Sequence, residues 1–183
     1  MGSITRGTIL FIGIFLFYSC NNTGKQKETN TKTVQNKILQ QTDGTISLKV
    51  DNAECYQDNA NPSSNTAEWS VLVSKSGRFN VWLSSATKDT TDLKYDNSVM
   101  LSILDNRIEA RPGCDKIIRN SSDVAYPYFR ADSFIGSLYI QDTGLFNIQI
   151  ISEKIVPKEI RKAESLGSDN SKLLSVFLTP ITQ

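Results

Sequence analysis

A tryptophan on the outer face of a predicted strand is the first residue of this sequence that could bind a ligand. Residues 77–83 alternate between apolar and polar side chains, and Trp82 shares the phase of Asn80, opposite to that of Phe79. Successive side chains of a strand point to opposite faces, so Trp82 and Asn80 should face away from the core. A large aromatic side chain there implies either a ligand that packs on the ring or a loop that covers it.

A second aromatic group lies in the long segment 107–132, which we expect to be a loop. Tyr126 and Tyr128 flank Pro127, and Arg130 follows them. Loops on a rigid scaffold often carry binding residues, although aromatic side chains beside a proline can also pin a loop to its domain. A sugar ring binds to a flat aromatic surface that polar groups surround. The candidate carbohydrate-binding residues are therefore Trp82, Asn80, Tyr126, Tyr128 and Arg130.

The composition excludes much of enzyme chemistry. The 183 residues include no histidine, which removes Ser-His-Asp and Cys-His catalysis and His-ligated zinc or iron. Paired carboxylates can hydrolyse glycosides, but no spacing brings Glu54 together with Asp132 or Glu109, and we expect no enzyme. A formal net charge of +1 argues against a nucleic-acid partner, because phosphate binding needs a concentrated basic face.

Two polar segments carry oxygen donors that could hold a structural calcium ion. The donors are Asp51, Asn52, Glu54, Asp58 and Asn59 in the first segment, and Asp89, Asp92, Asp96 and Asn97 in the second. Hard cations prefer such ligands, but neither segment has the defined spacing of an EF-hand loop. Solvated polar loops are the alternative interpretation.

The elements that must position these residues are short strands. From residue 45 onward apolar and polar residues alternate, as in Trp69-x-Val71-x-Val73, and turn residues separate the runs. The pattern predicts an all-β fold, an antiparallel β-sandwich or jelly roll, with Trp69 in its core. Only residues 157–166 look helical. The alternating runs cover residues 46–50, 69–73, 79–83, 99–103, 138–140, 146–150 and 174–178.

Four of these runs, in this order, resemble a known family. They are Ile46-x-Leu48-x-Val50-x-Asn52-Ala53-Glu54-Cys55, the paired run Trp69-x-Val71-x-Val73-x-x-x-Gly77-x-Phe79-x-Val81-x-Leu83, the late hairpin Phe134-Ile135-Gly136-x-Leu138-x-Ile140-x-x-x-Gly144-x-Phe146-x-Ile148-x-Ile150, and Val176-x-Leu178-x-Pro180. They are similar to galactose-binding-like β-sandwich modules of bacterial carbohydrate-active proteins, including those at the C-terminus of some α-L-fucosidases. The resemblance covers nearly all of residues 45–182. It implies a galactose-binding-like fold and non-catalytic sugar binding, or a supporting role beside a glycan-active partner. The chain departs from the family in its long 107–132 segment and in having no attached catalytic domain.

The N-terminal residues predict export. Residues 8–18 form an uncharged apolar run, which is too short for a spanning helix of about 20 residues but has the length of a signal-peptide core. The run ends at Ser19-Cys20, which resembles the lipobox of bacterial lipoproteins, whose cysteine is lipidated. An uncleaved anchor is the alternative. We expect a signal peptide over residues 1–19, a lipidated Cys20 and flexible tether over 20–44, and a β-sandwich domain over 45–183.

The tether is polar. Its only large apolar residues are Val34, Ile38 and Leu39, too few to offset the entropy of ordering the segment. Their helical spacing could form one or two frayed turns. After lipidation of Cys20, Cys55 and Cys114 remain, an even number in a compartment that permits disulfides. A Cys55–Cys114 bridge and free thiols both stay open.

Two functions are therefore expected from the sequence. The first is a lipoprotein anchored to the bacterial outer membrane through its N-terminal lipid, which binds carbohydrate through a sandwich face or loops. The second is an assembly module that contacts other envelope proteins and has no sugar site. Residues 21–24 lack the acidic run that accompanies surface export, which favours a position facing the periplasm.

Overall fold

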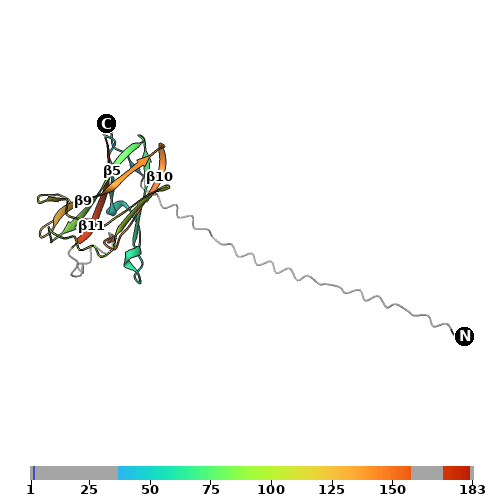
Figure 1. Cartoon of the computed structure of the whole chain (residues 1–183), viewed down its shortest axis with the longest axis horizontal. Coiled ribbons are helices and arrows are strands. Elements are labelled where there is room, and N and C mark those ends of the chain that lie inside the picture. The colour runs from blue at the N-terminus through green and yellow to red at the C-terminus, as the bar shows by residue number, and fades with distance from the viewer. Residues whose placement is uncertain (1, 3–36, 158–170, 182–183) are drawn as a thin grey trace, which may run out of the picture. The chain divides into compact units, whose positions relative to one another are not determined.

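The computed structural model describes residues 2, 37–157 and 171–181, and Figure 1 shows the whole chain. The predicted signal peptide, Cys20 and most of the predicted tether and helix lie outside these residues. Within them, no helix has the length and hydrophobicity needed to cross a membrane. Residues 34–183 form one compact unit, which holds both sheets and the core. A unit with its own core is expected to fold on its own.

Eleven strands in the described residues form two facing sheets, and nearly all pairs are antiparallel. The six-stranded sheet consists of β1 (Ile38–Leu39), β4 (Thr66–Val73), β10 (Gly144–Ile151), β6 (Val99–Ile103) and β7 (Asn106–Ala110), in that order, with β3 (Glu54–Tyr56) also paired to β4. The five-stranded sheet consists of β2 (Ile46–Lys49), β11 (Ser171–Pro180), β5 (Gly77–Thr87), β9 (Phe129–Ile140) and β8 (Lys116–Ile118), in that order. In Figure 1 β5, β9 and β11 run side by side. The predicted antiparallel β-sandwich is confirmed.

The core lies between the inner faces of the two sheets. Fully buried side chains come from both sheets at alternate positions, among them Leu48, Val71, Val81, Leu83, Leu101, Ile148, Ile150, Val176 and Leu178. Trp69 is 2% exposed, and its indole Nε1 donates a hydrogen bond to the carbonyl oxygen of Lys49 at 2.8 Å. The hydrophobic alternation therefore assigns the core face correctly, including the tryptophan that belongs to it.

Two segments differ from the sequence-based expectation. Ile38 and Leu39, expected in a flexible tether with a helical turn, form β1 parallel to β4, and Gln40 accepts backbone hydrogen bonds from Ser74 and Lys75 at 2.9 and 2.7 Å. The pairing with β4 supplies hydrogen bonds that a helical turn at this position would lack. Segment 107–132, expected as one loop, contains most of β7, all of β8 and the start of β9. Strand β8 has only three residues, too few for a periodic pattern, and a bulge interrupts the alternation of β9.

A β-bulge in β9 changes which side chains reach the outer face. Val81 of β5 pairs with Gly136, whereas the next residue, Trp82, pairs with Phe134, so that Ile135 is the extra residue. Gly136 has φ +141°, a conformation that L side chains rarely adopt. The bulge places Phe134 beside Trp82 on the outer face.

The disulfide that the sequence allows is not formed, and neither Cys55 nor Cys114 is disulfide-bonded. Cys55 lies on β3, and Cys114 follows β7 at the opposite edge of the six-stranded sheet. Strands β4, β10 and β6 separate β3 from β7, the strand that leads into the Cys114 segment.

Candidate functional site: an aromatic row on the five-stranded sheet

Three aromatic side chains form a row across the outer face of the five-stranded sheet. Trp82 of β5 pairs in register with Phe177 of β11 on one side and with Phe134 of β9 on the other. Residues directly opposite each other on neighbouring strands project to the same face. The Trp82 and Phe134 ring centroids lie 5.3 Å apart at an interplanar angle of 57°. Phe134 is 46% exposed, while Trp82 and Phe177 are half-buried.

A pocket of about 240 Å³ opens beside this row. Its apolar wall comes from Trp82 and Phe177. The polar side chains around the wall are Lys116, Arg130, Asp132 and Thr179. An aromatic surface with convergent charged and hydroxyl groups is the arrangement predicted for a sugar site.

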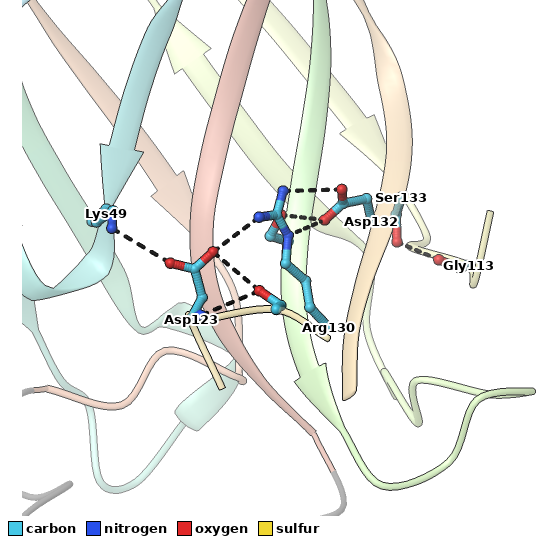
Figure 2. A network of polar contacts seen from close by, with 8 residues as sticks. Lys49, Gly113, Asp123, Arg130, Asp132 and Ser133 are labelled. Atoms are coloured by element: carbon cyan, nitrogen blue, oxygen red, sulfur yellow. Dashed lines mark hydrogen bonds and ion pairs between the residues drawn. The ribbon is translucent and has the colours of Figure 1, made fainter. Parts of the chain in front are cut away.

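A charged network holds the polar side of the pocket in place, as Figure 2 shows. The Arg130 guanidinium donates two hydrogen bonds to Asp132, from Nε to Oδ1 at 2.8 Å and from Nη2 to Oδ2 at 3.0 Å. Ser84 Oγ also donates to Asp132 Oδ1. Asp123, in the loop of residues 119–128, accepts from Arg130 Nη1 at 2.9 Å and lies 3.5 Å from Lys49 Nζ. A bidentate pair fixes the guanidinium plane, so Arg130 enters the pocket wall in one orientation.

Arg130 also packs on the aromatic row. Its Cζ lies 5.1 Å from the centroid of the Phe177 ring. Burial lowers the pKa of the Arg130 guanidinium, but the hydrogen bonds and charges of Asp132 and Asp123 outweigh burial and raise the pKa overall. Arg130 is therefore a permanent cation at the pocket wall.

The predicted site residues are only partly brought together. Trp82 and Arg130 line the pocket. Asn80 lies on the same face one row away, where its side-chain Oδ1 accepts a hydrogen bond from Ser137 Oγ at 2.7 Å. Tyr126 is 95% exposed in the 119–128 loop and lines neither of the pockets described here. Tyr128 lies between β8 and β9 near two lysines rather than at the pocket.

Those two lysines form cation–π contacts with the ring of Tyr128. Lys88 Nζ lies 5.1 Å and Lys172 Nζ 5.4 Å from the ring centroid. Cation–π contacts of this kind hold a loop against its scaffold. Tyr128 therefore pins the loop to the sandwich, which is the alternative role considered for this aromatic group. The pocket lies instead on the outer face of the five-stranded sheet.

Three residues of this face were not predicted from the sequence, namely Phe177, Phe134 and Lys116. Phe177 has the opposite phase to its buried neighbours in 174–178, which is the signal that identified Trp82 and could have identified it. The bulge conceals the phase of Phe134. Lys116 belongs to a strand of three residues, too short for a periodic pattern.

The calcium sites considered from the sequence are not assembled. Within the described residues, no group of three or more acidic or cysteine side chains gathers as metal ligands would. In the second segment, Asp89 accepts hydrogen bonds from Thr91 and from the backbone of Asp92. Asp92 in turn pairs with Lys94 at 2.7 Å. These carboxylates serve the turns of their own loop, and hydrogen bonds from those turns lower the pKa values of Asp89 and Asp92.

The carboxylates considered for glycoside hydrolysis also lie apart. Glu54 and Glu109 belong to β3 and β7 of the six-stranded sheet, whereas Asp132 belongs to β9 of the five-stranded sheet. A second pocket, of about 340 Å³, lies among the loops and is polar. There Glu153 accepts hydrogen bonds from the backbone of Asp96 and Asn97. It contains no aromatic surface for a sugar ring.

Comparison with known proteins supports the fold. No family model matches the sequence, and no curated protein matches it significantly. Among solved structures, an α-L-fucosidase from Vibrio sp. strain EJY3 superimposes with a TM-score of 0.59 and 21% identity over 78% of this chain. A GH26-CBM35 β-(1,4)-mannanase from Podospora anserina matches 77% of the chain at 11% identity, with a TM-score of 0.45. The chain spans 24% and 28% of these two enzymes. It shares a sandwich fold with part of a fucosidase.

Proposed function

We propose that this protein is a non-catalytic carbohydrate-binding lipoprotein of the bacterial cell envelope, with its sugar site on the outer face of the five-stranded sheet. The observation that carries the proposal is the aromatic row beside a pocket with convergent polar groups. The fold shared with part of an α-L-fucosidase adds support, because that protein acts on carbohydrate.

The pocket offers both contacts that a sugar ring needs. The C–H face of a pyranose packs on the indole of Trp82, and the ring of Phe177 closes the same wall. The carboxylate of Asp132 accepts hydrogen bonds from hydroxyl groups, and Lys116 and Thr179 can donate to ring or hydroxyl oxygens. Such a shallow site holds a sugar without excluding water, which suits binding and not hydrolysis.

Anchoring is proposed from the N-terminal sequence. Cys20 follows an apolar run in a lipobox-like position, so lipidation would place the sandwich at the outer membrane, on the periplasmic side. Cys20→Ser should abolish incorporation of labelled palmitate and release the protein from the membrane fraction. Retention of both label and membrane association in the variant would contradict this part of the proposal.

The sugar site is tested with the 34–183 protein, which is the compact unit. Isothermal titration against a panel of glycans is compared for the wild type, Trp82→Ala and the control Tyr56→Ala. Tyr56 is an aromatic residue 55% exposed on the six-stranded sheet. Trp82→Ala would remove about 60 Å² of contact between the ring and the sugar. At ~25 cal/mol per Å² this costs about 1.5 kcal/mol of binding free energy, or roughly tenfold in affinity.

We expect that loss for Trp82→Ala and none for Tyr56→Ala. Equal affinities of the wild type and Trp82→Ala, with both folded by circular dichroism, would remove the site from this face. If no glycan in the panel binds, the carbohydrate-binding function is refuted and the assembly function takes its place.

One observation favours that second function. Leu39, Leu72 and Leu145 are neighbours in register on β1, β4 and β10, and they are 63%, 41% and 51% exposed. A leucine row on an outer sheet face can bind another envelope protein. Leu72→Lys separates the two functions, because it would disrupt such a complex and leave glycan binding at Trp82 unchanged.

A further inference from the structure

The outer faces of the two sheets carry opposite charge. Register pairing and strand alternation place five cations and one carboxylate on the outer face of the five-stranded sheet. These residues are Lys49, Arg78, Lys116, Arg130, Lys172 and Asp132. The outer face of the six-stranded sheet has three carboxylates and one cation on its strands. These residues are Glu54, Glu68, Glu109 and Arg107. The excess of positive charge therefore lies on the face that holds the aromatic row.

The acidic groups near the pocket leave one of its cations without a counter-charge. Asp132 forms its ion pair with Arg130, and Asp123 is shared between Arg130 and Lys49. Lys116 is exposed and lies opposite Asp132 in the β8–β9 register, yet no ion pair joins them or involves Lys116 elsewhere in the described residues. An exposed ammonium at the pocket wall is available to an anionic group of a ligand.

We propose that the ligand of this face is an acidic glycan, whose sugar ring packs on Trp82 and whose carboxylate or sulfate group pairs with Lys116. The inference rests on the proposed function and names the substrate class of the same site. Lys116 and Trp82 line one pocket, so a single sugar unit reaches both. The pocket volume of about 240 Å³ lies below the range of roughly 300–1,000 Å³ for drug-sized ligands and suits about one ring.

The aromatic row favours a glycan over an anionic lipid surface as the partner. Trp82 and Phe177 are half-buried in the wall of a pocket, so a ligand that enters the pocket contacts both side chains. A residue that inserts into a membrane interface must instead project from the surface. The cations of this face outside the pocket are Lys49, Arg78 and Lys172. They attract the part of the polymer that extends beyond the pocket through longer-range electrostatics.

The experiment measures binding of the 34–183 protein to polygalacturonate and chondroitin sulfate by isothermal titration and affinity electrophoresis. Carboxyl-reduced polygalacturonate is the matched neutral polymer, since it keeps the linkages and loses the charge. Lys116→Gln is compared with Lys75→Gln, which removes the same charge from the turn between β4 and β5. Phosphatidylserine vesicles test the membrane alternative.

We expect at least one acidic polymer to bind, and Lys116→Gln to weaken that binding about tenfold, the usual effect of one hydrogen bond to a charged group. Lys75→Gln should leave the affinity within twofold, and 0.5 M salt should lower it because the attraction is screened. Reduced polygalacturonate should bind at least tenfold more weakly than its acidic parent.

Three results would overturn the inference. Equal binding of neutral and acidic polymers, lost in Trp82→Ala but not in Lys116→Gln, would refute the acidic ligand and leave the proposed function standing. Equal weakening by Lys116→Gln and Lys75→Gln would show attraction by net charge without a site at Lys116. Binding to anionic vesicles with no binding to any glycan would refute both the inference and the proposed function.

Discussion

The Arg130–Asp132 ion pair should contribute measurably to the stability of the sandwich, and its contribution can be worked out from the structure. The side chains are 19% and 12% exposed, and two hydrogen bonds of 2.8 and 3.0 Å join them. Removing one partner of a fully buried pair costs about 3–5 kcal/mol, whereas an exposed pair contributes about 0–1 kcal/mol. Asp123 lies 2.9 Å from Arg130, so it would supply part of the counter-charge after removal of Asp132.

We therefore expect Asp132→Ala to lower the free energy of unfolding by about 2 kcal/mol, or roughly 4–8 °C in Tm for a domain of this size. The measurement is urea unfolding of the 34–183 protein, followed by circular dichroism. A double-mutant cycle with Arg130→Ala should give a coupling free energy of about 1–2 kcal/mol. Glu109→Ala is the control, because its pair with Arg107 is 3.4 Å long and more than half exposed.

The control variant should lose less than about 0.5 kcal/mol. If Asp132→Ala costs no more than Glu109→Ala, or if the Arg130 and Asp132 variants are additive, the pair does not order the pocket wall. Arg130 would then not be held in one orientation by Asp132, even with the distances unchanged.

Three further predictions concern the bulge, a buried phenol and the cysteines. Gly136→Ala should lower the stability measured by thermal unfolding more than Gly77→Ala does. Both glycines have positive φ, but only a Cβ at position 136 would lie 3.1 Å from a neighbouring isoleucine. Equal losses of stability in the two variants would contradict this. Burial raises the pKa of Tyr95, so above pH 10 the unfolded state loses a proton that the folded state keeps, and stability falls by up to about 1.4 kcal/mol per pH unit. Tyr95→Phe should flatten that fall in urea unfolding at pH 9–11; an unchanged slope would refute the assignment. Unfolded, unreduced 34–183 protein should take up two iodoacetamide labels by mass spectrometry, at Cys55 and Cys114, whereas a bridge would leave none. In the folded protein Cys114 should react slowly, since burial and nearby carboxylates raise its pKa.

Period-two alternation was sufficient to predict the fold and the placement of both tryptophans. Trp69 shares the phase of buried valines and is 2% exposed, while Trp82 has the opposite phase and lies on the outer face. Alternation reports which face a residue occupies within one strand. It does not report which strands become neighbours, because that depends on contacts between distant parts of the chain. Phe177 and Phe134 become neighbours of Trp82 only through the order β11-β5-β9.

Two bulges decide which side chains occupy the proposed binding face. In β9, Leu138 and Ile140 face the core, so unbroken alternation would also turn Phe134 inward; the bulge at Ile135 reverses the phase. In β11 the register shifts between Leu173 and Ser175, so that Leu173 is buried.

The first bulge changes the aromatic surface of this face, and the second bulge changes its charge. Counted from the buried Val176 and Leu178, Lys172 would face the core, but the shift pairs it with Ala86 on the outer face. Bulges often re-aim side chains next to functional sites. One bulge here adds a phenylalanine to the aromatic row, and the other adds a lysine to the cationic face. The bulges therefore extend the aromatic row and the cationic face through local departures from the alternation that identified the fold, beyond the pocket residues Trp82 and Lys116 on which the acidic-glycan proposal rests.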